Sequence, residues 1–252
     1  EMLRTACLAA SHSAVYRADY QLPYLGVILE DCAAGRYDHV PLVRLYFHSY
    51  RCLSEPNATE HFFAYKQLLS EAASWLPMSD FRNVLLFGIN YCIRRMNTDE
   101  LSFLREALDL YKLGLQQETF LENGFLSRFT YKNIVAIGLN LNEIAWTKQF
   151  IETYTHLLAP EFRENYERFC RAKVLFEEGN YEQVQTLLHN LVFEDVLLEL
   201  NARLLLLKVY FERSEWRFLE GFLVAFERFV NRKKMLAYHA PNYRNIIQFT
   251  SK

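Results

Sequence analysis

Apolar residues recur along most of this chain at intervals of three and four, a spacing that places them on one face of an α-helix. In 42–53, for example, Leu42, Leu45, Tyr46 and Leu53 fall on one side of such a helix. Glycine, proline and asparagine interrupt the pattern at turns, so it predicts a succession of helices. The predicted helices span 2–20, 25–34, 42–53, 59–75, 81–95, 101–115, 129–141, 144–158, 160–178, 181–191, 197–212, 215–229 and 242–249.

The connections between these segments are short, about two to eight residues, and such links force consecutive helices to pack as antiparallel neighbours. No stretch alternates apolar and polar residues for long enough to predict a β-strand. We therefore expect an all-α fold of about five helix pairs, with additional pieces at the ends.

One unit of this pattern occurs twice. When Glu164–Leu188 is shifted by 35 residues onto Glu199–Leu223, seven positions are identical. These positions are Glu164/Glu199, Arg168/Arg203, Lys173/Lys208, Val174/Val209, Phe176/Phe211, Glu177/Glu212 and Leu188/Leu223. A fixed period of about 20–50 residues, with a helix on each side of a turn, is typical of stacked-helix arrays.

The first copy carries a small residue, Ala172, in its first helix, followed by the turn Gly179-Asn180-Tyr181. In these features it resembles the tetratricopeptide repeat (TPR), whose period is about 34 residues. It departs from that family at Val184 and Leu188, where the family prefers alanine and an aromatic residue. The resemblance implies a right-handed superhelical solenoid of antiparallel helix pairs.

The second copy departs further, with Leu207 in place of the small residue and Ser214 in place of the turn glycine. The clearest repeats are thus 164–198 and 199–233. Gly35-Arg36-Tyr37-Asp38 resembles the same turn and suggests an earlier repeat. We interpret 1–252 as a single TPR-like domain, and its first residue, a glutamate rather than methionine, suggests a fragment of a longer protein.

Composition excludes several classes of function. The net charge of −2 gives no general electrostatic attraction for nucleic acid or an anionic membrane. No apolar run of about 18 residues is free of charges, so no membrane insertion is expected. The chain contains 20 Phe and 16 Tyr residues, and aromatic residues at helical spacing are expected mainly in the core.

Candidate catalytic or metal-binding motifs are absent from the sequence. It has no His-Glu-x-x-His, no phosphate-binding glycine loop and no Gly-x-Ser-x-Gly. The cysteines lie far apart and odd in number, which indicates buried, reduced thiols in a cytoplasmic protein. No two histidines are three or four residues apart, so we expect no metal, no cofactor and no enzyme activity; a metal site made from residues distant in the sequence stays open as the alternative. The cysteines are Cys7, Cys32, Cys52, Cys92 and Cys170, and the histidines are His12, His39, His48, His61, His156, His189 and His239.

Two charged pairs repeat with the unit. Glu164 and Arg168 are four residues apart, as are Glu199 and Arg203, and this spacing predicts an ion pair on the surface of each helix. Such a pair stabilises a helix by only about 0.2–0.5 kcal/mol. The pair is therefore a marker of the repeat, and it contributes little to the stability of the helix.

Two lysines also repeat. Lys173 and Lys208 lie in the middle of the first helix of each copy, on the side that lines the inner groove in the resembled family. One helix-packing distance, about 10 Å, would separate their ammonium groups. Glu177 and Glu212 lie one turn later, so local ion pairs are the alternative to a binding role.

A groove of this kind predicts an interaction module without enzyme activity, since stacked repeats offer an extended concave surface to a protein or peptide partner. Tyr166, Lys173, Asn201 and Lys208 are the predicted contact residues, for an acidic or C-terminal peptide segment. Two alternatives stay open. One is an RNA-binding helical-repeat protein, against which the net charge argues. The other is a regulatory or small-molecule pocket domain that serves a separate catalytic module.

Overall fold

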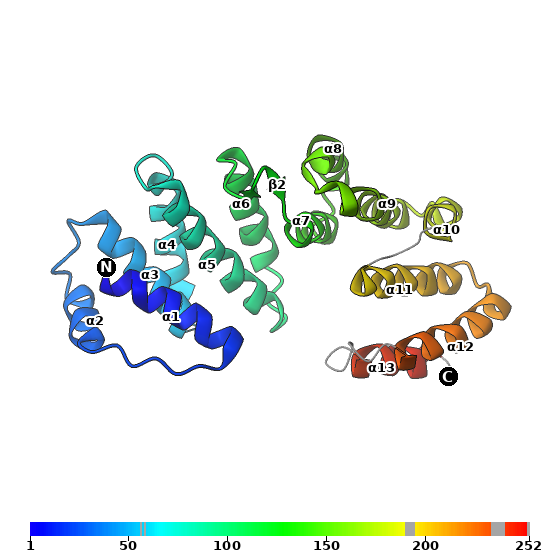
Figure 1. Ribbon diagram of the computed structural model, residues 1–252, viewed down its shortest axis with the longest axis horizontal. Coiled ribbons are helices and arrows are strands. Elements are labelled where there is room, and N and C mark those ends of the chain that lie inside the picture. Colours follow the sequence, from blue (N-terminus) through cyan, green and yellow to red (C-terminus); the bar gives the residue numbers. More distant parts are fainter. Residues whose placement is uncertain (56, 58, 190–194, 233–239, 251–252) are drawn as a thin grey trace. The chain divides into compact units, whose positions relative to one another are not determined.

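The computed structural model describes residues 1–55, 57, 59–189, 195–232 and 240–250, and over these residues the fold is all-α (Figure 1). The chain divides into two compact units, Glu1–Leu141 (unit 1) and Asn142–Lys252 (unit 2). The interpretation of the chain as one domain stays a prediction. Within the described ranges, no helix combines the length and the apolar character needed to cross a bilayer.

Unit 1 contains seven of the described helices and one short hairpin. They are α1 (Met2–Tyr16), α2 (Leu25–Ala33), α3 (Pro41–Ser54), α4 (Thr59–Ala72), α5 (Met78–Met96), α6 (Phe103–Gln116), β1 (Leu121–Glu122), β2 (Phe125–Leu126) and α7 (Arg128–Asn140). Sequence neighbours pack together, α3 with α4 and α5 with α6, while α1 and α5 both pack on α3. All predicted helices of this region are confirmed, with ends that shift by a few residues.

The expectation that the chain has no strand is wrong at one place. Strands β1 and β2 pair in an antiparallel hairpin, with Leu121 opposite Leu126. Asn123 and Gly124 form its turn, and both have positive φ, 52° and 81°. Asn-Gly is the preferred sequence for a two-residue hairpin turn because both positions must adopt left-handed backbone conformations. Strands of two residues are too short to produce an alternating pattern.

Aromatic side chains form the core of unit 1, as the composition predicts. The rings of Phe62 and Tyr91 stack with their centroids 5.0 Å apart, and Phe103 meets Phe62 edge to face at 5.4 Å. A Cβ atom at Gly88 would come within 2.7 Å of the Tyr65 ring, so only glycine fits beneath that tyrosine. The helices of this unit therefore approach closely around packed rings.

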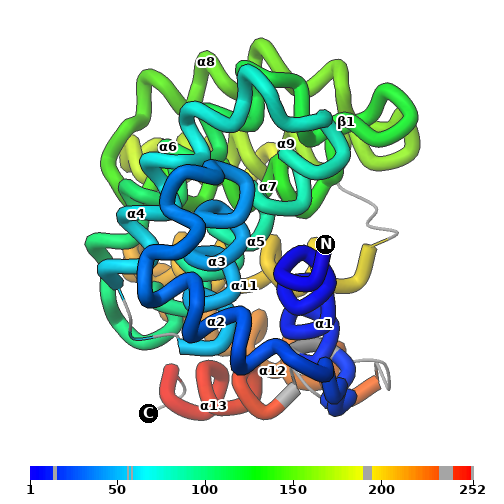
Figure 2. Tube along the Cα trace, turned by 90° about the vertical axis from the view of Figure 1, so that its left-hand side faces the viewer, coloured from blue at the N-terminus to red at the C-terminus, as the bar shows by residue number. Residues whose placement is uncertain are grey.

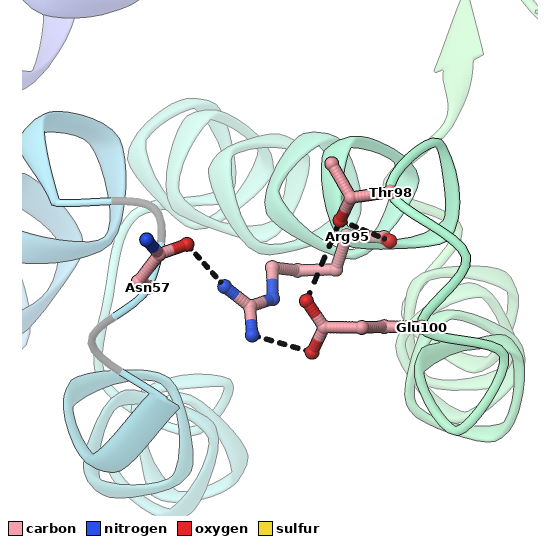
Figure 3. A network of polar contacts seen from close by, with 4 residues as sticks. All are labelled: Asn57, Arg95, Thr98 and Glu100. Atoms are coloured by element: carbon pink, nitrogen blue, oxygen red, sulfur yellow. Dashed lines mark hydrogen bonds and ion pairs between the residues drawn. The ribbon is translucent and has the colours of Figure 1, made fainter.

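A polar network closes one end of this core (Figure 3). Arg95, at the end of α5, donates hydrogen bonds to Asn57 at 2.9 Å and to Glu100, while its guanidinium lies 5.4 Å from the ring centroid of Phe103. The hydroxyl of Thr98 bonds to the backbone carbonyl of Arg95 at 2.8 Å. The network joins the α3–α4 connection to the segment before α6. Arg95 is only 8% exposed, so this link lies inside the fold.

Unit 2 contains the two repeat copies. Its elements are α8 (Ile144–Tyr154), a 3₁₀ turn η1 (Thr155–Leu157), α9 (Pro160–Glu177), α10 (Tyr181–His189), α11 (Val196–Glu212), α12 (Trp216–Arg232) and α13 (Ala240–Thr250). α9 packs with α10, α11 with α12, and α13 on α12. Figures 1 and 2 both show α12 and α13 side by side. The predicted helix 181–191 is observed as far as His189, and its last two residues lie outside the described part of the chain.

Candidate functional site

The 35-residue period of the sequence is also the period of the structure. α9 ends at Glu177 and α11 at Glu212, whereas α10 begins at Tyr181 and α12 at Trp216. Both the end of the first helix and the start of the second are therefore displaced by the same 35 residues. α9–α10 (pair A) and α11–α12 (pair B) are consequently two copies of one helix–turn–helix unit.

The turns of the two pairs have the same backbone geometry. Gly179 has φ 75° and Ser214 has φ 55°, both in the left-handed region. In pair A the amide of Asn180 donates to the carbonyl of Leu175 at 2.8 Å, and the equivalent bond in pair B measures 2.9 Å. This six-residue closure is the Schellman motif, which satisfies carbonyl groups at a helix end. Gly35, with φ 77°, closes α2 through the same bonds, in agreement with the early turn predicted there.

Both repeated ion pairs are confirmed. Arg168 lies 2.8 Å from Glu164, and Arg203 lies 2.7 Å from Glu199. The second pair is less exposed because the guanidinium of Arg203 also lies 4.3 Å from the ring centroid of Phe229 on α12. In pair B this arginine thus joins the two helices, beyond its role on the surface of one helix.

Tyr166 and Asn201, which belong to the four predicted contact residues, make hydrogen bonds within the fold. Tyr166 is 2% exposed, and its hydroxyl donates to Asp195 at 2.7 Å. Asp195 is the N-cap of α11 and accepts bonds from the amides of Leu197 and Leu198, so Tyr166 fixes the start of the next pair. Asn201 is half-buried, and its amide donates to the carbonyl of Leu197 at 2.7 Å. The sequence placed Tyr166 on a helix face without showing that another helix covers it.

The two lysines lie in different surroundings. Lys173 is half-buried on α9, whereas Lys208 is exposed on α11. Between Lys208 and Glu212, both in the described part of α11, no ion pair forms, so the local pairing considered above does not occur there. The assignment of Tyr166, Lys173, Asn201 and Lys208 to a partner-binding surface stays a prediction, and Lys208 is the member most open to solvent.

A recess lies beside α12 of pair B, and we call it the end groove. Its volume is about 540 Å³, and it runs along α12 between the end of α11 and α13. Its lining includes Phe211, Trp216, Glu220, Val224, Glu227 and Ile247. Phe211 and Trp216 are 51% and 52% exposed and lie edge to face, with centroids 5.5 Å apart. No motif in the sequence marks this groove.

The same positions in pair A are covered by pair B. Phe176 and Tyr181, the equivalents of Phe211 and Trp216, are half-buried. Gln185, the equivalent of Glu220, donates to Glu215 at 3.2 Å, and the side chain of His189, the equivalent of Val224, lies 3.2 Å from the hydroxyl of Tyr210. The surface that pair A uses to hold pair B is therefore the surface that pair B presents in the end groove.

The end groove differs from that interface in its charge. Glu220 and Glu227 contribute carboxylates to its lining, and no lysine, arginine or histidine lines it among the described residues. A carboxylate beside an apolar recess favours a cationic ligand group, because partial exclusion of water strengthens the attraction. The groove thus combines aromatic area with negative charge.

The described histidines and cysteines, which are potential metal ligands, lie outside the end groove. No group of three or more His, Cys, Asp or Glu side chains is placed to hold a metal ion in the described part of the chain. All five cysteines are buried, as predicted. The seven histidines are not all solitary, however, since the Nδ1 atoms of His48 and His61 lie 2.8 Å apart. They come from α3 and α4, and helix packing joins them across a separation that a linear motif does not show.

Comparison with known proteins adds no assignment: no family model, no curated protein and no solved structure matches this chain. The geometry of the two helix pairs and of the end groove is therefore the basis for the function proposed below.

Proposed function

We propose that this protein is a non-enzymatic, TPR-like helical-repeat module, a right-handed solenoid of antiparallel helix pairs that binds a protein partner. The end groove is its proposed docking surface, and an amphipathic helix of the partner is the proposed occupant. The recurrent left-handed turns and the packing of each helix on the next support the solenoid architecture.

The observation that carries this proposal is the exposure of the aromatic pair Phe211–Trp216. In pair A the equivalent residues are half-buried beside a following helix, and in pair B they line a recess open to solvent. Tryptophan is over-represented among interface residues that dominate binding, because it buries a large area with little loss of side-chain freedom. Pair A therefore indicates what kind of element this surface accepts: an α-helix with an apolar stripe.

Charge specifies the partner further. Because Glu220 and Glu227 line the groove, we expect lysine or arginine on the flank of the bound helix. Such a ligand follows the helix-in-groove mode, in which residues spaced by three and four positions enter one recess. The predicted acidic peptide at Lys173 and Lys208 would be a second, separate contact.

Designed peptides test the charge preference. Two helical peptides share one leucine stripe and differ only in flanking lysine or glutamate, and fluorescence anisotropy measures their affinity for the full chain. We expect the lysine peptide to bind at least about tenfold more tightly at low salt, and the difference to shrink as salt screens the carboxylates. Equal affinities, or preference for the glutamate peptide, would contradict the assigned partner chemistry.

A pair of variants tests the location. Trp216→Ala should weaken binding of the lysine peptide by about 2 kcal/mol or more, roughly 30-fold, as for a central interface aromatic. Phe218→Ala is the matched control, because Phe218 lies on the same helix, is 68% exposed and does not line the groove. Equal losses in both variants would place the binding site elsewhere. Sedimentation of the free protein shows whether a second copy of the chain occupies the groove instead.

A further inference from the structure

A pair of histidines in unit 1 has no role in the proposed partner binding. His48 extends from α3 and His61 from α4, and their Nδ1 atoms face each other at 2.8 Å. At this distance one hydrogen lies between the two nitrogens, so one ring donates and the other accepts. The ring of Phe47 meets both imidazoles edge to face, at 5.2 and 5.6 Å, and supports them in this position.

The histidine pair borders a pocket of about 310 Å³ between α2, the turn that follows it and the helices α3 and α4. Asp38 and Arg44 line the same pocket. Burial, the facing imidazole and Arg44 lower the pKa of His48 to about 4, and burial and Arg51 lower that of His61. Neutral imidazole is the state in which histidine binds metals.

We propose that His48 and His61 form a two-histidine chelate for a divalent transition-metal ion, with copper(II) and nickel(II) as the preferred ions. The pair brings two Nδ1 atoms from different helices within 2.8 Å of each other, and the adjoining pocket leaves room for water ligands. This inference departs from the expectation of no metal site, which rested on the absence of a linear motif.

The distance between the nitrogens decides the preferred geometry. Two nitrogens about 2.0 Å from one metal are about 2.8 Å apart when the angle between them is a right angle, and about 3.3 Å apart at a tetrahedral angle. The observed 2.8 Å is set by the hydrogen bond between the rings, and it is close to the separation of neighbouring positions in a square or octahedral site. Copper(II) and nickel(II) favour such sites, and copper(II) binds nitrogen ligands most strongly of the divalent ions. Zinc would require the rings to separate by about 0.5 Å.

Metal binding requires one change of tautomer. The ring that now donates from Nδ1 must carry its hydrogen on Nε2, while the accepting ring already does. The hydrogen moves between the two nitrogens of one imidazole through solvent, so both rings stay neutral and no net proton is released. Each Nδ1 then directs a lone pair at the ion.

Two arginines oppose the ion, and they do so unequally. Arg51 lies 2.6 Å from Glu55, which offsets its charge. Both arginines line the same pocket as the histidines, but Arg44 has no ion-pair partner among the described residues. Its charge should weaken metal binding, partly balanced by Asp38. Loss of that charge is therefore expected to strengthen the site, whereas it would weaken a site for phosphate or another anion.

Calorimetric titration tests the proposal on chelator-treated, tag-free protein at neutral pH, with nickel(II) and copper(II) as the probes. We expect one strong equivalent per chain, and a loss of at least about tenfold in affinity in His48→Gln and in His61→Gln, a range seen even for residues that only support metal ligands. His156→Gln, which removes an exposed histidine in unit 2, should bind as the wild type does. Arg44→Gln should bind a few times more tightly.

A second measurement avoids dependence on variants that fold poorly. Paramagnetic nickel(II) should broaden the imidazole resonances of His48 and His61 first in the wild-type protein. The proposal is overturned if other histidines respond first, if either glutamine variant binds as the wild type does, or if Arg44→Gln weakens binding. It is also overturned if inorganic phosphate raises the melting temperature of the protein and the two metals do not.

Discussion

Pair A and pair B are the same helix–turn–helix unit in two environments. In pair A, the face of α10 is covered by α11 and the following turn, and its polar side chains bond to them. In pair B, the equivalent face of α12 is covered only in part, by α13, and the end groove remains. The comparison teaches that position within the stack, more than the repeat sequence, decides whether an aromatic residue belongs to the core or to a binding surface.

The largest effect is expected where the copies differ in their interior. Leu207 in pair B replaces Ala172 in pair A, and both are buried, at 5% and 0% exposure. Leu207→Ala should lower the free energy of unfolding by about 2–5 kcal/mol, because it removes buried apolar contacts and leaves a cavity. Urea denaturation followed by circular dichroism measures this loss. A loss below about 1 kcal/mol would show that Leu207 is not tightly packed.

The reverse substitution in pair A should have a smaller effect. Ala172→Leu places a larger side chain at a fully buried site, and overpacking of this kind lowers the free energy of unfolding by about 1–3 kcal/mol. Ala225→Leu, on the exposed side of α12, is the control and should stay within about 0.5 kcal/mol. If both variants are as stable as the wild type, the repeat register assigned to Ala172 is wrong.

The turns permit a reciprocal exchange. Ser214 occupies the left-handed conformation that Gly179 occupies in pair A, at a conformational cost that glycine does not have. Ser214→Gly should raise the free energy of unfolding by about 0.5–1 kcal/mol, and Gly179→Ser should lower it by about 1 kcal/mol. No atom lies within 4 Å of a Cβ at Gly179, so contacts do not contribute there. Thermal melts measure the melting temperatures of both variants. Shifts of the same sign in the two melting temperatures would contradict this explanation.

The smallest effect on stability is expected at the repeated lysines. Lys208→Met should change the free energy of unfolding by about 0–1 kcal/mol, since solvent screens an exposed charge, and we expect a change of the same order for the half-buried Lys173→Met. Binding of an acidic peptide is the informative measurement. If the double variant retains it, the lysines are not the predicted contact surface. If it is lost while the lysine-flanked peptide still binds, the stack has two separate sites.

The sequence predicted most of the helix architecture because local signals mark its boundaries. Pro160 stands at the first position of α9, where its missing amide hydrogen is harmless, and Gly179 adopts the left-handed conformation that closes that helix. The Asn123-Gly124 turn carried a hairpin signal of its own, yet strands of two residues gave no periodicity to support it.

The candidate sites were harder to predict, because they depend on which faces meet. Helical spacing placed Tyr166 beside Lys173 and gave no sign that Asp195 would bond its hydroxyl at the start of the next pair. His48 and His61 meet only because α3 packs on α4. The end groove exists because of what covers α12, and a sequence repeat does not specify its neighbour.

The buried cysteines make the two units separately observable. Cys7, Cys32, Cys52 and Cys92 belong to unit 1, and Cys170 belongs to unit 2. Burial raises the pKa of each of the four unit 1 thiols, and the thiolate is the reactive form, so a thiol reagent modifies them mainly after the surrounding helices open. Labelling rates under native conditions, resolved by mass spectrometry, would therefore time the opening of each unit. If the units open independently, Cys170 should be labelled at a rate different from that of the four thiols of unit 1. If the chain opens as a whole, all five thiols should be labelled at the same rate.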